Sequence, residues 1–381
     1  MLYFDHNATC PMLPEARDAW LEAVERYPGN PSSLHRVGDR ADRAMNLARE
    51  KLAAMLGCHP LDIVFTSGAT ESANLVMRHA AAAYSEFASI WVSSIEHPCV
   101  TQPWRFLFPK RGVPLRSDEH GVVRLDAVES ALEKRRPALV AVMAANNETG
   151  VIQPWSGIGE VCREHGVDYF CDATQWLGRL PAKGLGSVDF VAGSAHKFGG
   201  PRGVGFLKVK GQGAFQGLFR GGMQEEGRRA GTENVPGILS MVKAMEVRES
   251  ALGQRAEEPR REWRDSFLRE LMARLPGSQV LGGQVERLWN TATVLLPAKD
   301  CRQRFAVRLD KAGFAVSTGS ACASGKEEPS PVLLSMGVAV EDTSRVLRFS
   351  AGWETTESDW KALLNGVLRV ASESDSTPGM E

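Results

Sequence analysis

Short apolar runs alternate with longer amphipathic stretches over the first two thirds of the chain. Six runs rich in β-branched and aromatic residues predict buried strands, at residues 62–66, 89–93, 138–143, 167–172, 189–193 and 203–209. Helical patterns lie mainly between them, at residues 13–55 with a turn-rich break at 27–33, and at 67–84, 99–107 and 125–135. This alternation predicts an α/β fold whose mostly parallel sheet is covered by helices on both faces.

The pattern changes after a charged helix predicted at residues 257–274. Residues 291–296 and 346–350 predict strands, and a last amphipathic helix begins at Thr356, where Asp359 completes a capping box. We therefore expect two domains. The large domain is formed by residues 13–257, and a smaller α+β domain by residues 1–12 and 258–381.

Composition argues against several classes of partner. The 381 residues include 45 basic and 46 acidic side chains, so the chain has no electrostatic footprint for nucleic acid or an anionic membrane. No apolar run approaches the roughly 18 residues of a membrane span, and the N-terminus has no signal-peptide pattern. Seven cysteines without regular spacing indicate a reducing compartment, so we expect a cytoplasmic protein without a metal site.

A lone lysine follows the predicted strand at 189–193. Ser194, Ala195, His196 and Lys197 come directly after it, and two glycines after Phe198 allow a tight turn. A lysine at the end of an apolar strand is partly desolvated, which lowers its pKa and frees the amine to attack a carbonyl. Such an amine is typical of a Schiff base with pyridoxal 5'-phosphate (PLP), although this motif alone is more often a solvated loop lysine.

Two other strand ends carry residues that suit the same cofactor. Asp172 ends one strand, where a buried carboxylate would keep a pyridine nitrogen protonated, and Gln175 could bind the phenolate oxygen of the ring. His97 follows another strand, and its imidazole could stack on the ring and move protons. Each of these residues also has an ordinary structural interpretation when it is considered alone. Asp172 could cap a helix, and His97 could be a structural histidine.

A phosphate site is predicted where the chain enters the helix after residue 66. Ala69 and Thr70 at that helix start offer backbone N–H groups and a hydroxyl, although such a segment is also an ordinary turn. Ser194 and His196 could complete the phosphate site. Asn147, which by itself could also belong to a turn, could donate its amide to ring or substrate.

Two residues of the C-terminal third are candidates for the substrate side of the site. Cys322 lies among small residues in a loop expected to be mobile, which favours a reactive thiol over a structural one. Arg348 lies on a predicted buried strand and therefore needs a carboxylate partner. A substrate carboxylate and an internal ion pair satisfy that need equally well.

Eight motifs follow one another along nearly the whole chain: residues 3–9, 29–33 with His35, 65–72, 146–150, 172–175, the segment around Lys197, 227–234 and 319–322. Together they resemble the NifS/IscS-type cysteine desulfurases, PLP-dependent enzymes of aminotransferase class V. The resemblance implies PLP fold type I (aspartate aminotransferase-like), with a sheet of the seven-stranded type in the large domain and a smaller α+β domain carrying the catalytic-cysteine loop.

The resemblance also implies roles for individual residues. Lys197 would carry PLP, Asp172 would face the pyridine nitrogen, and His97 would stack on the ring. Gln175 and Asn147 would contact cofactor or substrate. The phosphate would be held by four residues of the same chain and one of a neighbouring subunit, which implies a homodimer. These residues are Ala69, Thr70, Ser194 and His196, with Thr232 reaching across from the neighbour.

The expected activity is that of a cysteine desulfurase. Arg348 would bind the carboxylate of L-cysteine, and Cys322 would take the sulfur as a persulfide and pass it to an acceptor protein, leaving L-alanine. Iron–sulfur cluster assembly, tRNA thiolation and DNA phosphorothioation remain possible destinations of the sulfur. The alternatives are a selenocysteine lyase, another class V lyase or transaminase, and a non-catalytic scaffold, which the intact Lys197 and Cys322 disfavour.

Overall fold

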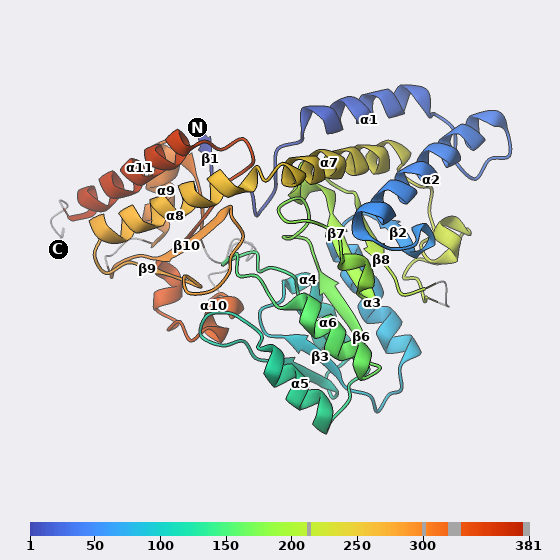
Figure 1. The fold of residues 1–381 in the computed structure, drawn as a ribbon, viewed down its shortest axis with the longest axis horizontal. Coiled ribbons are helices and arrows are strands. Elements are labelled where there is room, and N and C mark those ends of the chain that lie inside the picture. The colour runs from blue at the N-terminus through green and yellow to red at the C-terminus, as the bar shows by residue number, and fades with distance from the viewer. Residues whose placement is uncertain (212–214, 299–301, 319–328, 376–381) are drawn as a thin grey trace.

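Seven strands form the central sheet of the structure, a computed structural model that describes residues 1–211, 215–298, 302–318 and 329–375 (Figure 1). In spatial order they are β2 (Ile63–Thr66), β8 (Gly205–Lys208), β7 (Phe190–Ser194), β6 (Asp168–Asp172), β5 (Leu139–Ala141), β3 (Ile90–Ser93) and β4 (Gly112–Leu115). Strand β8 runs antiparallel to both of its neighbours, and the other pairs are parallel. The predicted mostly parallel, seven-stranded sheet is therefore confirmed.

The strands are buried on both faces, which explains why they appear in the sequence as continuous apolar runs. Successive residues of one strand enter different cores: Phe65 packs in the core that contains Leu52, whereas Val64 packs in the core that contains Leu75. The same alternation separates Tyr169 from the residue that follows it. Each strand therefore needs apolar residues at every position rather than at every second one.

Helices supply the other half of each core. One face is covered by α1 (Pro14–Arg26), α2 (Arg36–Leu56), α5 (Leu125–Lys134), α6 (Trp155–Glu164) and α7 (Val235–Gly253). The other is covered by α3 (Ala69–Ala83) and α4 (Pro98–Leu107). Short 3₁₀ turns are η1 (Pro60–Asp62), η2 (Leu185–Ser187), η3 (Ala195–Lys197), η4 (Gln224–Gly227) and η5 (Asp342–Arg345).

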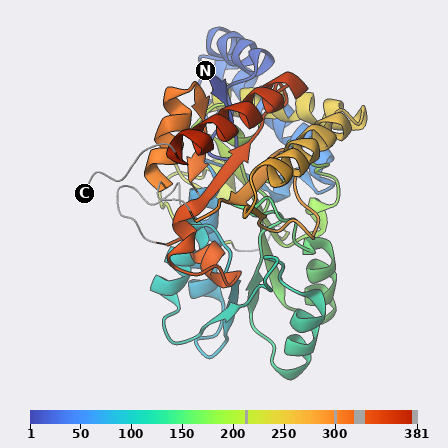
Figure 2. The same ribbon diagram turned by 90° about the vertical axis from the view of Figure 1, so that its left-hand side faces the viewer.

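A second, antiparallel sheet lies beside the first and has its own hydrophobic core (Figures 1 and 2). Its strands, in order, are β12 (Ser317–Thr318), β13 (Val346–Ser350), β10 (Thr291–Leu295) and β9 (Gln279–Val280), and β1 (Leu2–Tyr3) pairs in parallel with β11 (Phe314–Ala315) nearby. The helices that pack in this core are α8 (Glu257–Arg274), α9 (Arg302–Lys311) and α11 (Glu357–Asp375), whereas α10 (Pro331–Ser335) packs in a core of the large sheet.

The N-terminal segment packs with this C-terminal core. The Phe4 ring lies edge-on to Trp360 of α11, with ring centroids 4.9 Å apart.

The predicted capping box is present, because the backbone N–H of Thr356 donates to the Asp359 carboxylate at 2.8 Å. The division into domains at 13–257 and at 1–12 with 258–381 stays a prediction, which these separate cores support. No helix in the part of the chain that the structure describes is long and apolar enough to cross a membrane.

A buried ion pair joins three distant segments of the large core. Arg49 of α2 donates from Nη1 and Nη2 to the carboxylate of Glu225 in η4, at 2.8 and 2.9 Å. That carboxylate also accepts the backbone N–H of Phe65 at 3.0 Å. The Arg49 and Glu225 side chains are 9% and 1% exposed, so either charge would be costly if left alone.

Replacing Glu225 by alanine should therefore lower the free energy of unfolding by about 3–5 kcal/mol, because it leaves the buried Arg49 charge unpaired. Urea unfolding followed by circular dichroism measures the change. Glu226→Ala is a matched control, because Glu226 shares the positive φ of its neighbour but is exposed. Equal losses in the two variants would show that the backbone, and not the ion pair, determines the stability of this turn.

Candidate functional site

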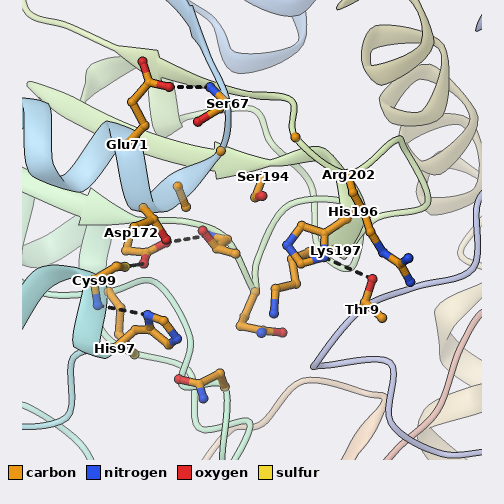
Figure 3. Close-up of a pocket in the computed structure, with 18 of the residues that line it drawn as sticks. Thr9, Ser67, Glu71, His97, Cys99, Asp172, Ser194, His196, Lys197 and Arg202 are labelled. Carbon is orange, nitrogen blue, oxygen red and sulfur yellow. Dashed lines mark hydrogen bonds between the residues drawn. The ribbon is translucent and has the colours of Figure 1, made fainter. Parts of the chain in front are cut away.

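A cavity of about 440 Å³ opens where several strands of the central sheet end (Figure 3). Parallel strands bring the residues that follow them to one edge of a sheet, which is where ligands bind in such folds. Nine of the residues predicted from the sequence line this cavity: Ala69, Thr70, His97, Asn147, Asp172, Gln175, Ser194, His196 and Lys197. The structure thus brings together side chains separated by up to 128 positions in the chain, from 69 to 197.

Lys197 ends the short turn η3, which follows β7 directly. Its Nζ donates to the backbone carbonyls of Asn7 and Ala8, at 2.6 and 2.9 Å. Cys10 fixes the same turn from the N-terminal side, because its backbone N–H donates to the carbonyl of His196 and its Sγ donates to the carbonyl of Lys197. The N-terminal segment therefore positions both the backbone and the amine of the candidate nucleophile.

Asp172 lies at the end of β6 and is 5% exposed. Its Oδ1 accepts the backbone N–H of Thr174 at 2.9 Å, so one oxygen does cap the following turn. The thiol of Cys99 lies 4.0 Å from Oδ2. Because the carboxylate also lines the cavity, it combines the capping role with a position from which it can bind a cationic ring nitrogen.

His97 begins helix α4, and its Nδ1 accepts the backbone N–H of Cys99 at 3.1 Å. In the neutral imidazole the proton must then sit on Nε2, the nitrogen not used by the cap. Burial lowers the pKa of His97; the Asp172 charge counteracts this effect and Lys197 adds to it. The ring is therefore neutral near pH 7 and able both to stack and to exchange a proton.

A second buried carboxyl lies beside this pair. Glu96 accepts hydrogen bonds from the Ser93 hydroxyl and the Met143 backbone N–H, at 2.8 and 2.7 Å. Burial, with the neighbouring charge of Asp172, raises the pKa of Glu96 to about 8. Glu96 is therefore mainly a neutral acid at pH 7 and adds little negative charge next to Asp172.

The start of α3 contributes an anion cradle to the same cavity. Gly68 precedes the helix with φ +147°, and a Cβ there would lie 3.2 Å from the Ser194 hydroxyl. A Cβ on Gly205 would lie 2.5 Å from the Cα of Gly68, so glycine is required for this close packing. The free N–H groups of a helix start, together with Ser194 and the guanidinium of Arg202, suit a phosphate.

The residues present fit PLP. Within the described residues, Gln175 Oε1 and Thr174 Oγ1 are buried and have no hydrogen-bond partner, and both residues line the cavity. A ligand with a polar ring substituent would satisfy such atoms. A buried carboxylate and an anion cradle in one cavity match a pyridinium nitrogen and a phosphate group.

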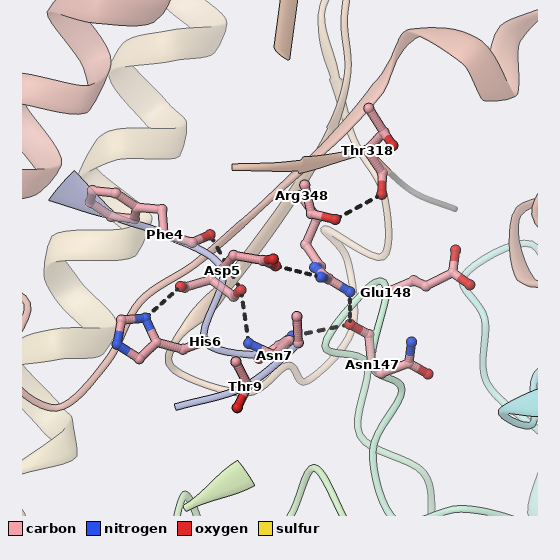
Figure 4. A network of polar contacts seen from close by, with 12 residues as sticks. Phe4, Asp5, His6, Asn7, Thr9, Asn147, Glu148, Thr318 and Arg348 are labelled. Atoms are coloured by element: carbon pink, nitrogen blue, oxygen red, sulfur yellow. Dashed lines mark hydrogen bonds and ion pairs between the residues drawn. The ribbon is translucent and has the colours of Figure 1, made fainter. Parts of the chain in front are cut away.

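Three predicted site residues are not among those that line the cavity. Arg348 donates from Nη2 to Asp5 Oδ1 at 2.7 Å and from Nη1 to the Asn147 carbonyl at 2.9 Å (Figure 4). The internal ion pair considered from the sequence is thus present, but the buried Nε of Arg348 has no partner in the described ranges. Thr232 lines a smaller cavity that shares Ser67 and Gly203 with the main one, and Cys322 lies outside the described residues.

Among the further residues that line the main cavity and were given no role from the sequence are Thr9, Cys99, Thr174 and Arg202. Cys99 and Thr174 lie two residues after His97 and Asp172, so extending each strand-end motif by one turn would have found them. Thr9 accompanies His196, whose Nδ1 is 3.1 Å from the Thr9 hydroxyl. That contact joins positions 187 residues apart, and no local pattern signals it.

This fold and this site define an α/β enzyme of the aminotransferase type, and the comparisons with known proteins agree. The chain belongs to the aminotransferase class-V family, whose profile matches residues 2–363. It is 38% identical over 377 residues to a protein named cysteine desulfurase from Cereibacter sphaeroides, a match that covers 98% of this chain and 96% of that protein. The sequence-based assignment to this family is therefore confirmed.

Solved structures give the same result. A structure titled NifS-like protein superposes with a TM-score of 0.88 at 31% identity, covering 98% of this chain and 99% of that one. A structure of SspA in complex with cysteine superposes with a TM-score of 0.79 at 29% identity, covering 92% and 98%. The similarity thus extends over both sheets of the molecule.

The half-buried imidazole of His196 gives a pH-dependent prediction. Burial, with the charges of Lys197 and Arg202, lowers the pKa of His196 from 6.5 to about 4. The unfolded chain then binds a proton more readily than the folded one between these values, so stability falls as the pH drops from 6.5 towards 4. Because the ring is partly exposed, we expect a loss of about 1–2 kcal/mol.

Urea unfolding at pH 7 and pH 4.5 measures this loss. The free energy of unfolding of His196→Asn should fall between these pH values by about 1–2 kcal/mol less than that of the wild type. His120→Asn, altered outside the cavity, should retain the wild-type pH dependence. If both variants lost stability on acidification as the wild type does, other groups would account for the effect.

Proposed function

We propose that this protein is a cysteine desulfurase that converts L-cysteine to L-alanine and transfers the sulfur, as a persulfide on Cys322, to an acceptor protein. One observation carries the proposal: Lys197, Asp172 and His97 line the same cavity as the anion cradle at the start of α3. The relative named cysteine desulfurase and the structural neighbour in complex with cysteine support the choice of substrate.

PLP is the cofactor that fits this site. When bound, it withdraws electrons from the substrate and so stabilises negative charge on the α-carbon. Asp172 would hold the ring nitrogen, and Gln175 and Asn147 would bind ring or substrate oxygens. The phosphate would lie against the anion cradle, held by Ala69, Thr70, Ser194 and His196, with Thr232 of a second subunit.

The side chains of this chain then have distinct tasks. The Lys197 amine carries the cofactor and removes the α-proton of the substrate, a task that suits an amine held at the end of a strand. Arg348 binds the substrate carboxylate, and its Nε is a donor without a partner in the described part of the chain. His97, neutral and protonated on Nε2, would stack on the ring of the bound cofactor and could move a proton at the substrate.

Sulfur transfer requires a second nucleophile. The thiolate of Cys322 attacks the substrate sulfur, so that a sulfur–sulfur bond forms as the carbon–sulfur bond breaks. The electron pair of the broken bond stays with the substrate carbon, which takes up a proton and becomes the methyl group of alanine. Cys322 is left as a persulfide, whose outer sulfur passes to the thiol of an acceptor protein in the cytoplasm.

Replacing Cys322 by serine should abolish sulfide release from L-cysteine in the presence of a thiol reductant, while the visible absorption of bound PLP is retained. The reason is that serine cannot accept a sulfur atom. Cys58→Ser, a partly buried cysteine far from the cavity, should retain full activity. Undiminished sulfide release from the Cys322→Ser variant would remove the thiol from this mechanism.

Replacing Lys197 by alanine should remove the visible absorption of the purified protein and lower the turnover of cysteine by about 10²–10⁴-fold or more, the contribution of a general base. Absorption spectra before and after borohydride reduction measure the covalent link. Lys210→Ala, which removes an exposed lysine, is the control. A borohydride-reducible band that persists in Lys197→Ala would refute the assignment.

A further inference from the structure

A second cavity, which we call the α8 cavity, lies between helix α8, the segment from Val280 to Arg287, and the region of Trp176 and Leu180. Its volume is about 820 Å³, and it shares no lining residue with the candidate active site. This volume lies within the range of sites that bind small molecules. None of the proposed catalytic steps uses it.

The charge of Arg287 in this cavity is not compensated. Its side chain is only 8% exposed, and its Nε and Nη1 are buried without a hydrogen-bond partner among the described residues. The nearest carboxylate, Asp265, lies 3.9 Å from Arg287 but 2.7 Å from Arg264, to which it is hydrogen-bonded. Asp265 therefore mainly neutralises Arg264. The desolvated guanidinium of Arg287 would be stabilised by a further anion.

The whole cavity has a positive surplus. Four arginines and two carboxylates line it, and Glu262, outside the lining, pairs with Arg269, which leaves a formal charge of +1. Burial, together with Arg264, lowers the pKa of Arg287 to about 10, so the side chain stays charged near pH 7. An arginine presents a planar fork that matches carboxylate and phosphate oxygens, which makes these groups the natural partners.

The remaining wall is apolar and partly exposed. Trp176 has a fixed orientation, because its indole N–H donates to the Pro181 carbonyl at 2.8 Å and its ring packs edge-on against Trp155. Leu180 and Met272 extend this surface beside the arginines. A ligand that binds here therefore gains from an apolar or aromatic body as well as from a negative charge.

We propose that the α8 cavity is a second ligand site, which binds an anionic small molecule carrying a carboxylate or phosphate group on an apolar or aromatic body. Arg287 binds the anionic group, and the face around Trp176 contacts the body. This inference does not depend on the desulfurase activity, because no residue of the α8 cavity takes part in it.

Phenyl phosphate is a suitable probe, since it combines both features, and isothermal titration calorimetry of the PLP-loaded enzyme measures its binding. Loading with PLP keeps the active-site cradle occupied. We expect phenyl phosphate to bind saturably. Inorganic phosphate alone and phenol alone should each bind at least about tenfold more weakly than phenyl phosphate, because each lacks one of the two features. Arg287→Met, which keeps the apolar stem and removes the charge, should weaken phenyl phosphate binding by at least about tenfold.

The matched control is Arg274→Met, an exposed arginine on the same helix outside the cavity, which should bind as the wild type does. Thermal unfolding of each variant shows whether it is folded. If Arg287→Met does not fold, Val285→Trp, which fills the cavity without altering an arginine, should abolish binding instead. Absence of saturable binding to the wild type, or equal binding by wild type and the folded cavity variants, would overturn the proposal.

Discussion

The N-terminal segment is the constraint on which the candidate site depends. The backbone carbonyl of Asn7 accepts hydrogen bonds from both Lys197 Nζ and Gln175 Nε2. The Asn7 side chain donates to the Asn147 carbonyl and to the Thr291 hydroxyl, and Asp5 pairs with Arg348. One short stretch of chain therefore holds residues from the ends of three strands of the large sheet and from two strands of the small one.

This arrangement explains why the reactive groups can be polar and yet buried. Each of them has a fixed partner that satisfies part of its hydrogen-bonding capacity: carbonyls for Lys197, the Thr174 N–H for Asp172, and the Cys99 N–H for His97. All three side chains also line the cavity. A polar group can be buried at low cost when such partners replace the water that it loses.

Much of the fold and of the site could be predicted from the sequence because the physics there is local. Strands buried on both faces must be apolar throughout, and the residues after parallel strands must meet at one edge, so nine of the residues predicted from the sequence line one cavity. Helix α6 was missed because Gly157 and Gly159 interrupt its pattern, although packing explains Gly157: a Cβ there would lie 2.7 Å from Leu125. Strand β4 was missed because it is a partly buried edge strand that contains Pro114.

Other features have no local signal. The sequence cannot show that β8 runs antiparallel or that Glu96 is protonated, because both depend on neighbours far away in the chain. The ion pair of Arg348 was one of two alternatives, and only the position of Asp5 shows that it forms. The direction of β8, the state of Glu96 and the partner of Arg348 depend on tertiary contacts. The positions and ends of strands depend instead on a few neighbouring residues in the sequence.

The pairing of the first residues with the last elements has a consequence for the order of folding. Strand β1 needs β11, Phe4 packs against Trp360, and Asp5 needs Arg348. On the ribosome, the large sheet can assemble as its strands emerge, but the segment that positions the lysine cannot dock until helix α11 has been made. A nascent chain that still lacks α11 therefore has no complete reactive centre, and an amine able to react with aldehydes is put in place only after that helix has been made.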